Sequence, residues 1–165
     1  MSYNKKNIVL RRKNTQDEEW VNKLLIEYWS DTVVVTRGKK HDASELPSII
    51  AEIDNKRVGV LTYRMDQDEC EIISLISIIT GTGIGTKLLH FIETMAREMN
   101  CNRIWLITTN DNENAVQFYL NNGYRIKAIH KDTIEKSRIL KPSIPLFNQD
   151  GIPIKDEIEI EKIIQ

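Results

Sequence analysis

The pattern of apolar and polar positions predicts a chain that mixes strands with amphipathic helices. Short runs that are rich in β-branched residues, or in which apolar and polar residues alternate, are typical of strands. Such runs occupy residues 7–11, 33–35, 49–53, 57–64, 71–79, 103–109, 124–130 and 157–163. In the last run glutamate or lysine alternates with isoleucine, so we expect one solvated face there.

Three segments repeat apolar residues every three or four positions, which predicts helices with one buried face. The first follows Thr15 and Glu18, which have capping-box spacing, and presents Trp20, Val21, Leu24, Leu25, Tyr28 and Trp29. The second presents Ile84, Leu88, Phe91, Ile92, Met95, Ala96 and Met99 and should end near Asn100. The third spans residues 115–121, with Asn110 and Glu113 as its cap and Gly123 as a left-handed stop.

Three or four strands precede the central helix, which predicts an antiparallel meander at the start of the sheet. Asp54 and Asn55 are turn residues, so the strands on either side of them should form a hairpin. Residues 37–44 are polar and interrupted by Gly38, and we expect a loop there. This order argues against a dinucleotide-binding half, in which the glycine loop follows an early strand of alternating βαβ units.

The most informative segment is residues 78–89, IITGTGIGTKLL, in which a β-branched strand leads through spaced glycines into a helix. Gly81, Gly83 and Gly85 allow a ligand to approach the backbone closely. The unpaired N–H groups of the helix start carry the positive end of its dipole. The segment therefore suits a pyrophosphate.

Spacing separates the phosphate-binding motifs that compete for this loop. A Walker A loop needs GxxxxGK[ST], but Thr86 holds the second glycine position and Leu88 follows Lys87. A dinucleotide fingerprint needs GxGxxG, but the third glycine comes one residue early. An ordinary flexible turn between a strand and a helix is a further interpretation of the loop taken alone.

Composition describes an ordinary globular protein and excludes several classes of partner. The 165 residues suit one domain spanning 1–165, and the net charge of −1 gives no electrostatic case for binding nucleic acid or membrane. No long apolar span or charged leader follows Met1, so we expect a cytoplasmic protein. Cys70 and Cys101 suit buried thiols, and His90 and His130 have no partners at metal-ligand spacing, so we expect no metal.

A second motif, NDNENAVQFYLNNGY at residues 110–124, follows the glycine loop by one helix and one strand. Together the two motifs resemble the GNAT acetyltransferase superfamily, whose QxxGxG or RxxGxG loop has its glycine positions at Gly83 and Gly85. Thr80 departs from the Gln or Arg of that loop. The strings TRGKKHDAS, WLITTNDN and KPSIP to DEIEIE look like one bacterial branch of the superfamily.

The resemblance implies an α/β fold, a mixed and mostly antiparallel sheet whose two central parallel strands splay apart. It also implies acetyl-CoA as co-substrate, with its pantetheine arm between those strands. The implied cofactor-binding residues are Leu75, Ser77, Thr82, Gly83, Ile84, Gly85, Thr86 and Asn112.

For the chemistry, the resemblance implies that Tyr119 is the general acid and that a main-chain N–H near Leu75 holds the oxyanion. The base is left open between Glu71 and Glu69, either acting through water, because relatives place an acid where this chain has Ile76. Arg37, Lys39, Lys40 and His41 form a basic segment that suits either solvent or an acidic substrate. Without the resemblance, Tyr119 is a core aromatic.

These observations favour an N-acetyltransferase that acts on the primary amine of a small molecule or peptide. Two alternatives stay open: a noncatalytic CoA-binding sensor or protein-interaction module, and an unrelated nucleotide-phosphate binder. A homodimer formed by pairing of strand edges near residues 157–161 is a further possibility, although the glutamates there oppose such pairing.

Overall fold

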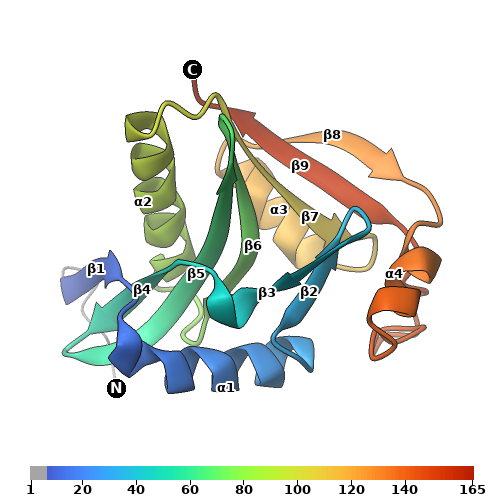
Figure 1. The fold of residues 1–165 in the computed structure, drawn as a ribbon, viewed down its shortest axis with the longest axis horizontal. Helices are drawn as coiled ribbons and strands as arrows, with labels where there is room; N and C mark the ends of the chain where they lie inside the picture. The colour runs from blue at the N-terminus through green and yellow to red at the C-terminus, as the bar shows by residue number, and fades with distance from the viewer. Residues whose placement is uncertain (1–6) are drawn as a thin grey trace.

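The computed structural model describes residues 7–165 and contains one seven-stranded sheet and one separate hairpin (Figure 1). The sheet strands are β1 (Ile8–Arg12), β4 (Ser48–Ile53), β5 (Lys56–Asp66), β6 (Glu69–Ser77), β7 (Arg103–Thr109), β8 (Arg125–His130) and β9 (Glu157–Ile163). Their spatial order is β1-β4-β5-β6-β7-β9-β8. The hairpin pairs β2 (Val33–Thr36) with β3 (Lys39–Asp42). The predicted mixed and mostly antiparallel sheet is confirmed.

The central strands β6 and β7 form the parallel pair of the sheet, and they pair over only part of their length. Residues 69–72 of β6 pair with residues 103–106 of β7. Against β5, Tyr63 faces Ile72 whereas Thr62 faces Ser74, so Ile73 is an extra residue in β6. Such a bulge bends its strand, and no pairing of β6 with β7 continues beyond it. The predicted splay is therefore present.

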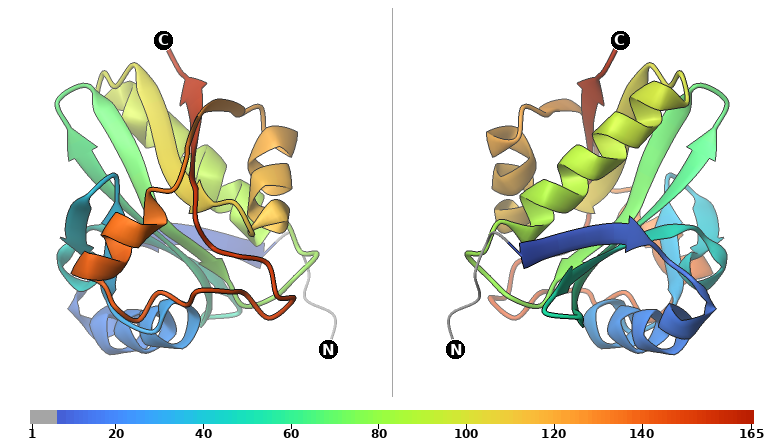
Figure 2. Two further views of the ribbon diagram at one scale, coloured as in Figure 1. Left: turned by 90° about the vertical axis from the view of Figure 1, so that its right-hand side faces the viewer. Right: turned by 90° about the vertical axis from the view of Figure 1, so that its left-hand side faces the viewer.

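Helices cover both faces of the sheet (Figure 2). The helices are α1 (Glu18–Trp29), α2 (Ile84–Glu98), α3 (Glu113–Asn121) and α4 (Ile134–Leu140). Because strand side chains alternate, Ile50 packs with Leu24 and Leu25 of α1, whereas Ile49 packs with Leu88 and Ile92 of α2. No helix within residues 7–165 is long and apolar enough to span a bilayer.

The predicted helices correspond to α1, α2 and α3, with differences at their ends. Asn14 and Asp17 form the capping box, one residue ahead of the predicted Thr15 and Glu18. Tyr28 and Trp29 continue the helical period of α1, yet 48% and 38% of their surface is exposed because they extend past the sheet toward a cleft described below.

Three other features of the structure differ from the predictions: residues 37–44, the cap of α3 and an additional helix. Within residues 37–44, which were expected to be a loop, Arg37 and Gly38 form the left-handed turn of the β2–β3 hairpin and residues 39–42 form its second strand, while Ala43 and Ser44 begin a short 3-10 helix. Asn112, not Asn110, caps α3. Helix α4 was not predicted, because its sequence has no clear period. The predicted hairpin at Asp54 and Asn55 and the left-handed Gly123 are confirmed.

The predicted solvated face of β9 is wrong. Glu157, Glu159 and Glu161 are 1%, 8% and 2% exposed, because Arg37 of the β2–β3 turn covers the first and basic side chains of β7 and β8 cover the other two. Arg103 of β7 contacts both Glu159 and Glu161, at 3.1 and 2.6 Å, and Lys127 of β8 contacts the same two carboxylates at 3.9 and 4.0 Å. Strand β9 lies between β7 and β8, so it has no free edge for the predicted pairing of two chains.

A buried ion pair holds the start of α1 against the sheet, and its removal should destabilise the protein. Asp17 is fully buried and accepts hydrogen bonds from Arg11 and Arg57 at 2.7 to 2.8 Å. We expect Asp17→Asn to lower the free energy of unfolding by about 3 kcal/mol, because two arginines lose their charged partner. The midpoint of urea unfolding would measure this, with the exposed Glu19→Gln as control.

The same pair predicts the pH dependence of stability. The Arg11 hydrogen bond, opposed by burial, holds the pKa of Asp17 well below its usual value. The stabilisation is therefore complete above the unfolded-state pKa of about 4 and is lost as the pH falls further. If Asp17→Asn lowers the free energy of unfolding no more than Glu19→Gln does, the ion pair contributes little to stability.

Candidate functional site

A cleft of about 700 Å³ opens on the α1 side of the sheet, where β6 and β7 part. Ile73 of β6 and Ile107 of β7 line its floor. Its walls come from the end of α1, strand β2, the start of α3, helix α4 and the segment that follows α4. The cleft therefore adjoins the unpaired stretch of the two central strands.

The glycine loop leads from the open end of β6 into α2. Gly81 and Gly83 have φ values of 72° and 79°, a left-handed conformation that favours glycine. Gly83 precedes the helix and supplies no side-chain cap, so the first-turn amides of Ile84, Gly85 and Thr86 have no side-chain partner within residues 7–165. Two side-chain hydrogen bonds hold the loop: Ser77 Oγ and Thr82 Oγ1 donate to Ile79 O at 2.9 and 3.2 Å.

Leu75 and Ser77 present main-chain groups to the gap. Ile78 N–H donates to Val58 O across the β5 side at 2.9 Å, and Ile76 and Ser74 pair with β5 in the same register. Because main-chain groups alternate along a strand, those of Leu75 and Ser77 point away from β5. They are therefore free to pair with an extended ligand.

Asn112 lies on the β7 side of the gap, at the start of α3, and lines the cleft. Its Oδ1 accepts from Ala115 N at 3.3 Å and caps the helix. The side-chain amide is thereby turned so that its N–H₂ group can donate to a ligand.

Tyr119 lies on the opposite face of the sheet from the cleft and is not among the cleft-lining residues. Its ring packs edge-on against Phe118 and Tyr124, and 6% of the residue is exposed. Within residues 7–165 its hydroxyl has no hydrogen-bond partner, and no side-chain polar atom there is both buried and unpartnered. This combination shows that the hydroxyl oxygen of Tyr119 is not fully buried. Burial raises the pKa of the Tyr119 phenol, which stays protonated.

Glu71 is 1% exposed and sits at the closed end of the gap, within a polar cluster under the β2–β3 hairpin. Thr36 Oγ1 donates to its Oε2 at 2.7 Å and Arg64 Nη1 donates to its Oε1 at 3.0 Å. Burial raises the pKa of Glu71, although the hydrogen bonds from Thr36 and Arg64 oppose this. A carboxylate with a raised pKa beside a cleft is suited to accept a proton.

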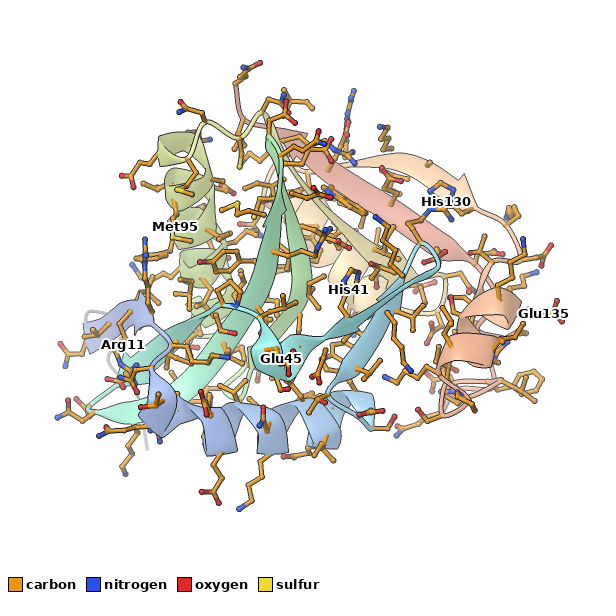
Figure 3. The ribbon with its side chains drawn as sticks, in the orientation of Figure 1. Arg11, His41, Glu45, Met95, His130 and Glu135 are labelled. Atoms are coloured by element: carbon orange, nitrogen blue, oxygen red, sulfur yellow. The ribbon has the colours of Figure 1, made fainter. Side chains whose placement is uncertain are left out.

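Thr36 connects Glu71 to the cleft, which Thr36 lines and Glu71 does not. His41, at the centre of the sheet face in Figure 3, places its Nε2 2.9 Å from Thr36 Oγ1. A threonine hydroxyl has one proton, and Glu71 receives it, so His41 Nε2 is the donor in this contact. One lone pair of Thr36 Oγ1 remains for a group in the cleft. Burial and the charges of Arg64 and Lys39 lower the pKa of His41.

The two glutamates predicted as candidate bases have different surroundings. Glu69 lies near the β5–β6 turn, where Arg103 Nε donates to it at 2.9 Å and 39% of its side chain is exposed. Ile76, at the position where an acid was expected, is buried against α1. Thr80 is exposed.

The basic segment at residues 37–41 does not act as one unit. Arg37 pairs with Glu157 at 3.2 Å, Lys39 and Lys40 are exposed, and His41 turns inward. Asp42 accepts from Ser44 N and does not orient His41. Sequence reasoning missed Thr36 as a site residue, because a threonine at the end of a β-branched run gives no signal of its cross-strand partners.

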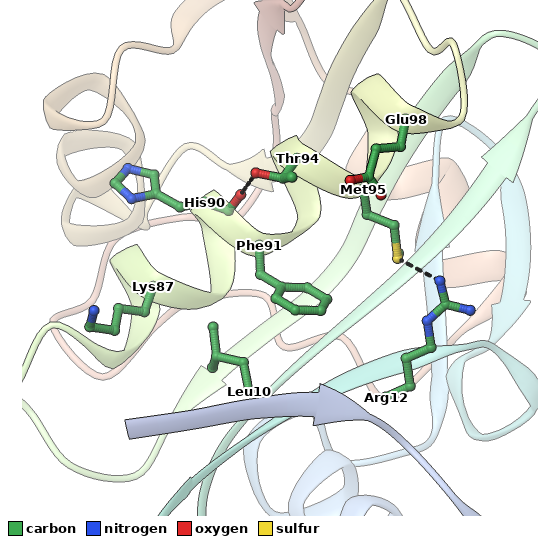
Figure 4. Close-up of a pocket in the computed structure, with 8 residues that line it drawn as sticks. All are labelled: Leu10, Arg12, Lys87, His90, Phe91, Thr94, Met95 and Glu98. Carbon is green, nitrogen blue, oxygen red and sulfur yellow. Dashed lines mark hydrogen bonds between the residues drawn. The ribbon is translucent and has the colours of Figure 1, made fainter. Parts of the chain in front are cut away.

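A second cavity of about 400 Å³ lies between β1 and α2 (Figure 4). Leu10, Phe91 and Met95 line it, and Arg12 Nη2 lies 3.5 Å from Met95 Sδ. It contains none of the predicted site residues. No group of three or more His, Cys, Asp or Glu side chains within the described range is arranged to hold a metal ion.

The sequence and fold can now be compared with known proteins. The acetyltransferase (GNAT) family model matches residues 13–124, which includes the bulged strand, the glycine loop and α3. The chain belongs to the GNAT acetyltransferase family. The match ends before β8, so the segment containing α4 and β9 lies outside it.

Similar bacterial proteins share much of the chain. The uncharacterized protein YdhI of Bacillus subtilis is 50% identical over 107 residues, covering 65% of this chain and 67% of YdhI. The uncharacterized protein YxbD of the same organism is 39% identical over 149 residues, covering 90% of this chain and 94% of YxbD.

Solved structures share the GNAT fold. The IAA acetyltransferase from Bacillus cereus superposes with a TM-score of 0.73 at 20% identity, covering 94% of this chain and 99% of that one. A GNAT acetyltransferase from Elizabethkingia anophelis with acetyl-CoA bound superposes with a TM-score of 0.69 at 17% identity, covering 95% and 98% of the two chains.

Proposed function

We propose that this GNAT protein transfers the acetyl group of acetyl-CoA to the nitrogen of a primary amine. The observation that carries the proposal is the parting of β6 and β7 beyond Ile72, next to a helix start whose amides are unpartnered. A parallel pair that parts in mid-sheet leaves main-chain groups without partners, which is costly unless a ligand or water pairs with them.

The residues at this site fit CoA. The amides of residues 82–86 form a cradle for the diphosphate at the positive end of α2. Leu75, Ser77 and Asn112 present hydrogen-bonding groups along the gap, where the pantetheine arm would lie. When bound, acetyl-CoA would supply a thioester whose carbonyl carbon an amine can attack.

Glu71 is the candidate base, with Thr36 as its link to the cleft. Once the acceptor has lost its ammonium proton to solvent, the neutral amine attacks, and its next proton passes to the free lone pair of Thr36 Oγ1 while the Thr36 proton moves to Glu71 Oε2. His41 Nε2 holds the Thr36 hydroxyl in the orientation that this transfer needs. The new N–C bond forms as the C–S bond breaks.

Leu75 and Tyr119 would act on the other atoms of the reaction. The Leu75 N–H points into the gap, where it can donate to the developing oxyanion. Tyr119 would give its phenolic proton to the departing sulfur. Glu71 then returns its proton through solvent, and Tyr119 regains one.

The proposal is tested by adding a charge to the cradle. Thr86 lies in the first turn of α2, where an aspartate favours the helix but repels a diphosphate. We expect Thr86→Asp to weaken binding of acetyl-CoA and CoA about 30-fold in calorimetric titration, with unfolding temperature unchanged or raised.

Thr94→Asp adds the same charge to an exposed position in the middle of α2 and should bind acetyl-CoA as the parent does. Stabilisation by ATP but not by CoA, or equal affinity in both variants, would count against the proposed function.

The noncatalytic alternative has one supporting observation, the position of Tyr119 outside the cleft lining. A CoA-binding module that has lost catalysis would bind acetyl-CoA and release no thiol with any amine.

A further inference from the structure

The wall of the cleft that faces away from the glycine loop is apolar. Its side chains come from α1, β2, α4 and the segment after α4, and they include Trp29, Val35, Ile134, Ile144, Pro145 and Phe147. None of the predicted CoA-loop residues lines this wall. The space is therefore left for the group that receives the acetyl.

Two charged groups of the cleft, Lys141 and Glu157, already have partners. Among the described lining residues Lys141 is the one cation, and its Nζ donates to Trp29 O at 2.8 Å. Burial lowers the pKa of Lys141, which weakens it further as a partner for a carboxylate. Glu157 is paired with Arg37 at 3.2 Å.

The remaining acids favour an incoming ammonium group. Asp111, two residues after the end of β7, accepts from Thr109 Oγ1 at 2.6 Å and lines the cleft. Glu27 is exposed at the rim. These carboxylates attract a cation toward the gap, and the polar lining side chains of Asn148 and Gln149 lie in the segment after α4.

Two hydrogen bonds join neighbouring elements at one side of the cleft. Lys141 Nζ and Trp29 O, together with Ser30 Oγ and Ser143 Oγ at 3.2 Å, join the end of α1 to the segment after α4. A volume of about 700 Å³ is of the size that small molecules occupy.

We propose that the acceptor is a small primary amine with an uncharged, apolar body, such as an arylalkyl or alkyl amine. This inference rests on the acetyl transfer proposed above. The apolar body packs against Trp29, Ile144 and Phe147, and the amine points toward the gap and Thr36.

Matched pairs of amines test the class. Thiol release would be measured with 2-phenylethylamine against ethanolamine, and with hexylamine against 1,5-diaminopentane. L-Phenylalanine adds a carboxylate to the first amine. We expect kcat/KM to be about 30-fold higher for the apolar member of each pair, because the apolar group leaves water. L-Phenylalanine should be a poorer substrate than 2-phenylethylamine.

Two substitutions in the apolar wall of the cleft test whether this wall causes the preference for apolar amines. Phe147→Ala and Trp29→Ala, at positions 57% and 38% exposed, should reduce the preference about tenfold without weakening CoA binding. Met99→Ala removes a side chain that is 59% exposed at the far end of α2 and should leave the preference unchanged.

The results separate this inference from the proposed function. Equal rates within each pair, or turnover of polar amines alone, would overturn the acceptor class and leave acetyl transfer in place. Calorimetric titration of 2-phenylethylamine into the CoA-loaded protein measures the class independently of turnover, and its failure to bind would also overturn it. If CoA itself does not bind, the proposed function fails first.

Discussion

Tyr119→Phe is expected to lower kcat for acetyl transfer about 100-fold and to change the affinity for acetyl-CoA by no more than about twofold. The substitution removes one oxygen from a packed aromatic cluster and keeps the ring that contacts Phe118 and Tyr124. A protonated phenol whose pKa is raised by burial remains a donor at every pH at which the protein is folded and active. Loss of the hydroxyl should therefore affect the chemical step and not the binding step.

Tyr124→Phe is the matched control for this prediction. Tyr124 is also buried, and its hydroxyl donates to Glu93 Oε1 at 3.4 Å. Its loss should cost about 1 kcal/mol of stability and leave kcat nearly unchanged. If both variants turn over at the parent rate, Tyr119 is a core aromatic and another group protonates the thiolate.

Glu71→Gln is expected to lower kcat/KM about 1,000-fold, because an amide cannot accept the amine proton. In the parent protein kcat/KM should fall as the pH drops through the pKa of Glu71, which lies above that of an ordinary glutamate because the group is buried. The base accepts a proton only when it is deprotonated. Its raised pKa therefore moves the acid limb of the kcat/KM profile to higher pH.

Variants at Thr36 separate a proton route from a structural role. Thr36→Val keeps the shape of the side chain and removes the link between Glu71 and the cleft, and we expect about a 100-fold loss of kcat. Thr36→Ser restores the hydroxyl and should restore most of the rate.

Thr62→Val is the matched control, because Thr62 is a buried threonine in β5 whose hydroxyl contacts Ser48 at 2.8 Å. It should cost stability and leave the pH profile unchanged. A parent-like rate in Thr36→Val would direct attention back to Glu69 or to water as the proton acceptor.

The sequence was most informative where structure depends on near neighbours along the chain. The glycine loop, the hairpin at Asp54 and Asn55 and the stop at Gly123 follow from local backbone preferences. The buried face of α2 follows from its periodicity, although Met99 at its end is exposed. The two GNAT motifs were readable for the same reason, since each is a short contiguous segment.

Contacts between residues far apart in the sequence determine the structural features that the sequence did not predict. Thr36 and Glu71 are 35 positions apart, and Arg37 and Glu157 are 120 apart, so neither pair leaves a local signal. The alternation in β9 predicted a solvated face, but arginines on β7 and β8 bury it. Local propensity determined α1, α2 and α3, most strands and the left-handed glycines before α2. The bulge at Ile73, the cleft and the surroundings of Glu71 exist only once the sheet is assembled, because they are made by strands and helices packing across it.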